Sequence, residues 1–144
     1  MAQPLWAKEH VKRYRETGGA DGHIWTGFDG KGKFPCLLLT TKGRVSRKAR
    51  TTPLIYGKDK AAFIIIGSQG GLPKHPKWYL NLQENPNVQV QIKADVFNAS
   101  ARTADAAERR RLWPMMSAIY PPYQEYQKKA IDHREIPVVI LTRA

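Results

Sequence analysis

Short apolar segments separated by turn residues dominate this chain. Residues 61–67 form a nearly continuous apolar run, which is typical of a buried strand, and residues 87–92 alternate apolar and polar side chains, as a half-buried strand does. Residues 57–60 are the predicted turn into the 61–67 strand, and such short connections favour antiparallel pairing. The predicted strands are residues 36–41, 51–56, 61–67, 87–92, 96–102 and 137–142.

Four other segments carry the signals of helices. The first begins near Pro4, ends at Gly18-Gly19 and gathers apolar side chains on one side and basic side chains on the other. Asp105 and Glu108 have the spacing of a capping box at the start of the third. The predicted helices are residues 4–17, 77–84, 105–118 and 123–130, and the glycine-rich residues 18–33 are a predicted loop.

Antiparallel strands with inserted helices define a mainly β (α+β) fold. About six strands are enough for a small barrel or a rolled sheet. The chain of 144 residues has no internal repeat, low-complexity tract or linker. We therefore expect one domain over residues 18–144, preceded by an amphipathic helix within residues 1–17.

The net positive charge of the chain and the absence of common catalytic motifs reduce the number of possible functions. The 24 Lys and Arg residues exceed the 12 Asp and Glu residues, and the resulting net charge of +12 favours nucleic acid, an anionic lipid surface or a phosphorylated small molecule as the partner. No P-loop, dinucleotide-binding fingerprint or nucleophile elbow occurs, and the four histidines lack metal-ligand spacing. Cys36 is the single cysteine, so no disulfide forms within the chain, which fits a reducing cytoplasm.

The first candidate site is the basic loop, residues 42–50. It carries five basic residues and no acidic one between two predicted strands, so its side chains should extend from one rim of the sheet. Arginines placed in this way can bind phosphate or carboxylate groups bidentately. A solvated hairpin loop that only aids solubility is the alternative interpretation.

The second candidate site is the segment from Gly67 to Asn81. Ser68 to Gly71 follow a buried strand and form a turn that can present backbone N–H groups to an anion or to the edge of a polar ring. Pro76 then starts a helix whose free N–H groups favour anions, and Trp78 could form an aromatic wall. An ordinary strand-to-helix connection with the tryptophan in the core is the alternative.

The third candidate site is a group of tyrosines, Tyr120, Tyr123 and Tyr126. The last two share a helical face, and the first precedes a Pro-Pro pair that can bring it to the same surface. Core packing is the usual role of such a stripe. Three buried phenols would however need three hydrogen-bond partners, which favours the wall of a hydrated pocket.

Together these segments resemble the deazaflavin (F420)-dependent nitroreductase family of split β-barrel oxidoreductases. The resemblance covers roughly residues 34–142 and lies in the order of the motifs. The matching pieces are Leu38-Leu39-Thr40-Thr41-x-Gly43-Arg44-x-Ser46, Arg50-Thr-x-Pro53-Leu54, Gly67-Ser68-x-Gly70-Gly71, His75-Pro76-x-Trp78-Tyr79-x-Asn81-Leu82, Glu84-Asn85-Pro86-x-Val88, Trp113-Pro114, Tyr120-Pro121-x-Tyr123-x-x-Tyr126 and Ile136-Pro137-Val138-Val139.

The resemblance implies a split β-barrel that binds coenzyme F420 through the basic loop and through the turn from Ser68 to Gly71, which we call the Gly-Gly turn. Val45 and Gln69 stand where such proteins often carry lysine, so two positive charges near the cofactor tail are absent. The implied acceptor-side residues are Ser68, Tyr120, Tyr123 and Tyr126. The implied cofactor-binding residues are Arg44, Ser46, Arg50, Pro53, Gly67, Ser68, Gln69, Gly70, Gly71, Pro76, Lys77, Trp78 and Asn81.

The implied activity is hydride transfer from reduced F420 to a flat, electron-poor acceptor, either a quinone or a nitroaromatic compound, with the quinone preferred. Such chemistry belongs to the cofactor and needs no metal or catalytic triad in the protein. The alternatives are an FMN-dependent enzyme of the same fold, a non-catalytic F420 carrier, or a basic nucleic-acid-binding domain, for which no reader motif is present. We expect a cytoplasmic protein whose residues 4–17 lie on an anionic membrane surface at its inner face, cover the mouth of the active site, or pack on the barrel.

Overall fold

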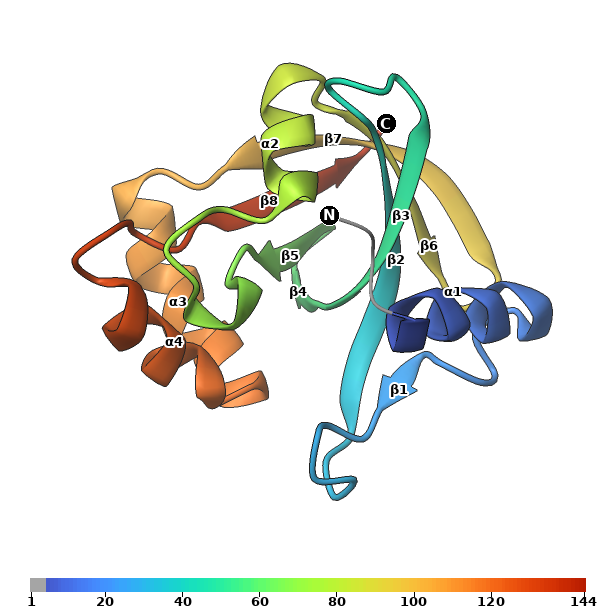
Figure 1. Cartoon of the computed structure of the whole chain (residues 1–144), viewed down its shortest axis with the longest axis horizontal. Coiled ribbons are helices and arrows are strands. Elements are labelled where there is room, and N and C mark those ends of the chain that lie inside the picture. The colour runs from blue at the N-terminus through green and yellow to red at the C-terminus, as the bar shows by residue number, and fades with distance from the viewer. Residues whose placement is uncertain (1–4) are drawn as a thin grey trace.

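The computed structural model describes residues 5–144 (Figure 1). Pro4, the predicted start of the first helix, lies outside the described residues. The helices are α1 (Leu5–Thr17), the 3-10 turn η1 (Gln69–Gly71), α2 (Lys77–Glu84), α3 (Ala106–Ile119) and α4 (Pro122–Ala130). The strands are β1 (Ile24–Trp25), β2 (Phe34–Lys42), β3 (Ala49–Ile55), β4 (Gly57–Asp59), β5 (Ala62–Ile66), β6 (Asn87–Ile92), β7 (Asp95–Thr103) and β8 (Val138–Arg143).

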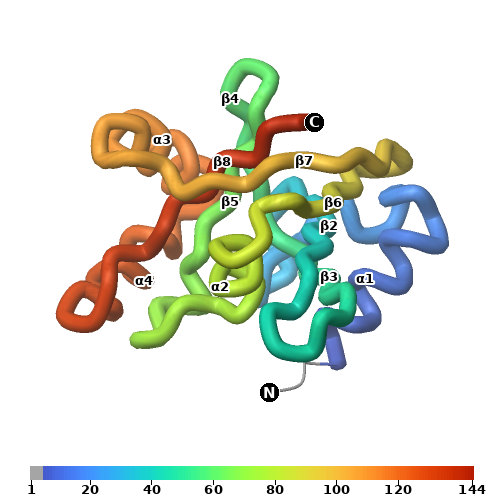
Figure 2. Tube along the Cα trace, turned by 90° about the horizontal axis from the view of Figure 1, so that it is seen from above, coloured from blue at the N-terminus to red at the C-terminus, as the bar shows by residue number. Residues whose placement is uncertain are grey.

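All the strand pairs are antiparallel, and the strands form one strongly curled sheet. The order is β1-β2-β6-β7-β8-β5-β4, with β3 paired to β2 beside this path. The sheet curls into a half-barrel, with α3 and α4 on one side and α1 on the other (Figures 1 and 2). The predicted mainly β (α+β) split-barrel class is therefore confirmed.

Two short strands lie where the sequence predicts none. β1 pairs with β2 inside the glycine-rich predicted loop, and β4 occupies the predicted turn 57–60. The prediction of that turn is wrong because Gly57 serves packing instead: a Cβ on it would lie 2.6 Å from Met116 Sδ. The chain reverses at Lys60, whose φ of 55° allows the tight connection between the paired residues Asp59 and Ala62.

The sheet separates two apolar cores, because successive residues of a strand face opposite sides. Ile65 and Val139 face the barrel interior, where Trp78, Tyr79 and Leu82 of α2 close it. Ile64, Ile66, Val138 and Ile140 face the other side, where α3 and α4 cover them. The predicted capping box starts α3: Glu108 N–H donates to the Asp105 carboxylate, and Asp105 N–H donates to the Glu108 carboxylate.

Helix α1 is attached to the sheet by buried polar contacts as well as by Val11 and Tyr14. The Tyr14 hydroxyl donates to the carbonyl oxygen of Cys36 at 2.9 Å and accepts from Lys93 N–H at 2.9 Å. Burial raises the pKa of Tyr14 to about 12, so the phenol remains a donor at neutral pH. The inner face of this helix is therefore used for packing on the barrel.

Candidate functional site

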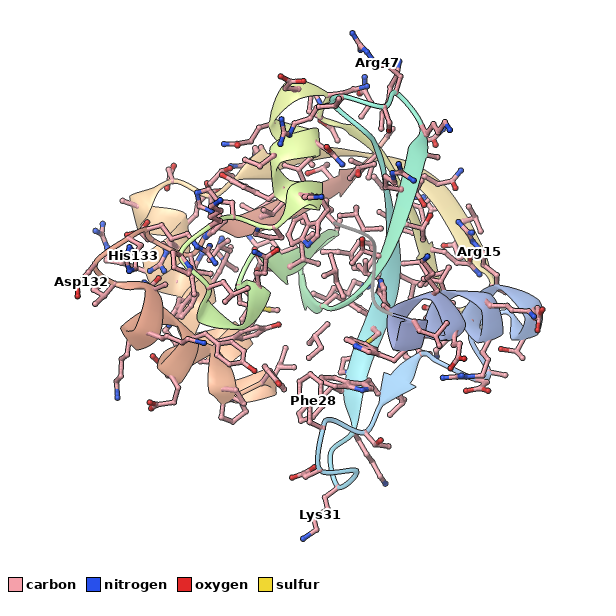
Figure 3. All side chains as sticks on the ribbon, viewed as in Figure 1. Arg15, Phe28, Lys31, Arg47, Asp132 and His133 are labelled. Carbon is pink, nitrogen blue, oxygen red and sulfur yellow. The ribbon has the colours of Figure 1, made fainter. Side chains whose placement is uncertain are left out.

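The basic loop is an ordered connection between β2 and β3. Gly43 N–H donates to the Lys48 carbonyl oxygen at 2.8 Å, and Arg47 N–H donates to the Gly43 carbonyl oxygen at 2.9 Å. Lys48 N–H donates to Ser46 Oγ at 3.2 Å, so the Ser46 hydroxyl shapes the loop. The side chain of Arg47 projects from the end of this hairpin (Figure 3). The loop thus presents its cations to solvent from a fixed backbone.

Asn81 of α2 holds this loop in place. Its Oδ1 accepts from Arg44 N–H at 3.1 Å, and its Nδ2 donates to Thr41 Oγ1 at 3.1 Å. Asn81 is buried, so both polar atoms of its amide are engaged within the protein. Between the loop and α2 lies a cavity of about 310 Å³, which is lined by Lys42, Gly43, Arg44, Arg47, Asn81, Glu84 and Asn85.

The strand register separates two of the predicted cofactor ligands, Arg50 and Pro53. Arg50 is paired with Thr41, and paired residues of antiparallel strands share a face. The hydroxyl of Thr41 bonds Asn81, so this face of β3 looks toward α2. Pro53 is paired with Leu38, which packs against α1. The structure therefore places Arg50 beside the basic loop and α2, and Pro53 on the opposite face.

The Gly-Gly turn has an unusual backbone. Gln69, Gly70 and Gly71 have φ values of 44°, 62° and 79°, all in the left-handed region, which is costly for glutamine. A Cβ on Gly71 would lie 2.7 Å from the carbonyl oxygen of Tyr126, so this glycine permits contact with α4. A Cβ on Gly70 would meet no atom within 4 Å, so that position faces open space.

In this turn several amide groups are unpaired, whereas carbonyl oxygens are hydrogen-bonded within the protein. The amide groups of Ser68, Gln69 and Gly70 have no hydrogen-bond partner among residues 5–144, and neither does the Ser68 hydroxyl. The carbonyl oxygens of Gly67, Ser68 and Leu72 instead accept from the guanidinium of Arg134. Sequence reasoning missed Arg134, because a single arginine in a polar loop before the last strand gives no signal of this role.

Three of the other predicted ligands lie in or beside the core. Trp78 is 8% exposed and packs against Tyr79 in the barrel interior. Gly67 is buried, and a Cβ on it would lie 2.8 Å from Pro137 Cγ, so its small size serves packing. Pro76 is buried at the start of α2, whereas Lys77 is exposed. The alternative interpretation of the tryptophan as a core residue fits this arrangement.

The three tyrosines do gather, but in different environments. The Tyr120 and Tyr126 hydroxyls lie 3.3 Å apart, and the ring centroids of Tyr120 and Tyr123 are 5.0 Å apart. Tyr120 and Tyr123 belong to the core under α3 and α4, while Tyr126 lies at its partly exposed margin. Burial raises the pKa of Tyr120 and of Tyr123 well above the usual range, so both phenols stay protonated.

The tyrosines continue into an aromatic cluster with the strand β1 and the loop that follows it. Phe34 contacts the Tyr120 ring edge-on at 4.9 Å, and Trp25 contacts Phe28 at 4.8 Å. Phe28 is 79% exposed and lies at the end of β2 opposite Arg47 (Figure 3). An aromatic surface therefore joins the tyrosines to solvent on the side away from the basic loop.

An antiparallel half-barrel with a basic hairpin loop and a glycine-rich turn is the architecture found in split β-barrel oxidoreductases. A family model described as F420H(2)-dependent quinone reductase matches residues 6–143, and the chain belongs to this family. An F420H(2)-dependent quinone reductase of Mycobacterium tuberculosis is 36% identical over 137 residues, which cover 93% of this chain and 87% of that relative.

Solved structures of similar chains support the same assignment. An F420-H2 dependent reductase, FDR-A, aligns with a TM-score of 0.67 at 41% identity over 74% of this chain and 93% of its own. A chain from a domain-swapped dimer aligns with a TM-score of 0.70 at 38% identity over 94% of this chain and 96% of its own. The predicted family, the F420-dependent reductase class and F420 as the cofactor of that class are confirmed.

Proposed function

We propose that this chain transfers a hydride from reduced F420 to a quinone. The observation that carries the proposal is that α2 connects to both of the predicted cofactor-binding features. The Gly-Gly turn leads into Pro76 at the start of the helix, and the basic loop is bonded to Asn81. At 1.5 Å per residue Pro76 and Asn81 are about 8 Å apart along the axis, so one short helix holds both the segment that follows the turn and the basic loop.

The residues present fit F420 by the chemistry of their donors. The exposed cations Arg44 and Arg47, together with Arg50, suit the phosphate and the carboxylates of the oligoglutamate tail. The unpaired amides of the Ser68–Gly70 turn suit the polar edge of the deazaflavin ring, and the open space at Gly70 allows close approach. Glu84 also lines the cavity beside the loop, and its negative charge disfavours an anion next to it.

The protein's task toward the acceptor is to orient it and to stabilise charge on its oxygens. When bound, reduced F420 supplies a hydride, which is two electrons and one proton, and the quinone takes up one further proton to become a hydroquinone. Tyr126, whose hydroxyl lies 3.3 Å from that of Tyr120, can donate a hydrogen bond to an acceptor oxygen as negative charge builds there, and so can Ser68. Burial raises the pKa of Tyr120 well above its usual range, so this phenol keeps its proton at neutral pH.

The aromatic surface favours a quinone over a nitroaromatic acceptor. This surface extends from Tyr120 through Trp25 to the exposed Phe28. It is therefore longer than the contact area of a single small aromatic ring. Quinones carry an apolar ring system that stacks on such side chains. The family name and the name of the Mycobacterium tuberculosis relative support this choice.

The test begins with cofactor binding and proceeds to single turnover. F420, FMN and FAD are titrated into the protein and followed by fluorescence. Reduced F420 is then oxidised anaerobically by menadione or by a nitroaromatic compound, with and without protein. We expect F420 binding and a protein-dependent rate that is higher with menadione. FMN binding alone would support the FMN enzyme, and F420 binding without any rate increase would support a carrier.

We further propose that the protein associates with an anionic membrane surface through a patch around Trp6 and Phe28. Leu5, Trp6 and Phe28 are 71%, 51% and 79% exposed, and the Trp6 and Phe28 rings are in edge contact at 6.2 Å. Exposed aromatic side chains beside lysines favour the headgroup region. Within residues 5–144 no helix is long and apolar enough to cross a membrane. The inner face of α1 packs on the barrel, so its first turn and its exposed outer face are available for this contact.

A further inference from the structure

Arg134 connects the loop before β8 to the turn that precedes α2. Its Nη1 donates to the Gly67 carbonyl oxygen at 2.9 Å, its Nη2 to that of Ser68 at 2.7 Å, and its Nε to that of Leu72 at 2.9 Å. Nη1 also lies 3.1 Å from His75 Nδ1. One side chain therefore binds both ends of the Gly-Gly turn and the histidine that follows it.

The turn is backed by positive charge. Arg134 makes no ion pair with an acidic side chain among residues 5–144, and Lys129 Nζ lies 3.5 Å from the Gly70 carbonyl oxygen. Burial, and then the charge of Arg134, lower the pKa of His75, so its ring is neutral at pH 7 and can accept from the guanidinium. In a trans peptide the N–H points opposite to the C=O. The Ser68 and Gln69 amides, which share peptides with the Gly67 and Ser68 carbonyl oxygens, therefore point away from Arg134.

We propose that Arg134 is a positioning residue for the cofactor site. By taking up the carbonyl oxygens of Gly67, Ser68 and Leu72, it fixes the turn so that the Ser68, Gln69 and Gly70 amides are directed toward the ligand. The ligand class is the electron-rich, carbonyl-bearing edge of a fused pyrimidinedione ring. This inference rests on the proposed function, in which the same turn holds the F420 ring.

The physical reason lies in the cost of this backbone. Three successive residues with positive φ, including Gln69, keep their conformation only where surrounding contacts fix it. A guanidinium has several donors in a rigid planar fork and can bind three carbonyl oxygens at once, whereas a lysine ammonium on a flexible stem does not fix their relative orientation. Without these bonds a carbonyl oxygen can turn toward the ligand and repel its electron-rich edge.

The experiment compares Arg134→Lys and Arg134→Ala with Arg110→Ala, an exposed control on α3 that removes one positive charge elsewhere. We measure F420 affinity by fluorescence titration and, in the ligand-free protein, amide exchange in residues 67–72, where the hydrogen-bonded amides of Gly67, Gly71 and Leu72 give the signal. We expect Arg134→Lys to weaken F420 binding at least tenfold and to accelerate exchange in this segment, with less than a twofold change for the control. Millimolar guanidinium should restore F420 binding to Arg134→Ala saturably, and equimolar sodium chloride should not.

Two outcomes would overturn the inference. The first is wild-type F420 affinity in Arg134→Lys, and the second is accelerated exchange over the whole chain at a lowered Tm, which would show a merely structural role. If the wild-type protein itself fails to bind F420, the proposed function fails. In that event unchanged exchange of residues 67–72 in Arg134→Lys still refutes the positioning of the turn, so the two failures are distinguishable.

Discussion

Replacement of Asn81 by alanine should show how far cofactor affinity depends on the placement of the basic loop. Asn81 is 7% exposed and holds Arg44 N–H and Thr41 Oγ1, each at 3.1 Å. A net contribution of about 0.5–1.5 kcal/mol for each hydrogen bond gives a loss of about 1–3 kcal/mol in the free energy of unfolding. Because the loop then samples other positions, we also expect weaker F420 binding.

Arg44→Ala is the matched comparison, because alanine keeps the backbone N–H that Asn81 accepts. It should leave the free energy of unfolding unchanged. A charge-assisted hydrogen bond to phosphate contributes about 1.5–3 kcal/mol, so F420 affinity should fall about tenfold or more. The Asn81→Ala variant keeps all its cations, and its F420 affinity should therefore keep the wild-type dependence on salt, whereas that of Arg44→Ala should depend on salt less steeply.

Urea unfolding measures the free energy of unfolding of each variant. Fluorescence titration of F420 at low and high ionic strength measures the affinity and its dependence on salt. Wild-type stability combined with lost affinity in Asn81→Ala would show that the amide touches the ligand directly. Wild-type values for both quantities would show that the loop is held without Asn81, and would refute the reasoning.

Four further predictions concern single features of the site. Arg50→Ala should weaken F420 binding about tenfold without loss of stability, since Arg50 is exposed at the edge of β3; titration and thermal melting check this. Tyr126→Phe should lower turnover in steady-state assays while F420 affinity stays the same, because only a donor is lost. Tyr123→Ala should cost about 3–5 kcal/mol of unfolding free energy, and Tyr123→Phe much less, because the ring is buried. A Trp6→Ser and Phe28→Ser double variant should lose co-sedimentation with anionic liposomes; equal sedimentation would remove the patch as the anchor.

Elements with strong local signals could be predicted with nearly correct bounds. The capping box of α3 and the alternation in β6 are such signals, and α2 lies between Pro76 and Asn85-Pro86 as expected. The short strands β1 and β4 could not be predicted in this way, because with 2 and 3 residues they are too short to show an apolar run or an alternation of their own. Gly57 reads as a turn residue locally, yet its absent side chain makes room for α3.

The basic loop could be found from the sequence because its cations are adjacent in the chain. The contacts of Arg134 could not, because its partners lie 59 to 67 residues away and three of them are backbone carbonyl oxygens, which every residue carries. Asn81 was found through the resemblance. Its observed contacts to Thr41 and Arg44 add a positioning role that the motif alone does not reveal.

Buried phenols can satisfy their hydrogen bonds either with water or with one another. The spacing of the three tyrosines favours the first, in the wall of a hydrated pocket. In the structure the hydroxyls of Tyr120 and Tyr126 instead lie 3.3 Å apart and bond to each other. This pair supplies one proton more than its mutual bond uses, so one hydroxyl can still donate outward. Since Tyr126 lies at the margin and Tyr120 is 6% exposed, the outward donor is best placed on Tyr126, with Tyr120 behind it. Tyr123, packed beneath both, then sets their position by its bulk, and its removal should disturb the pair through the core.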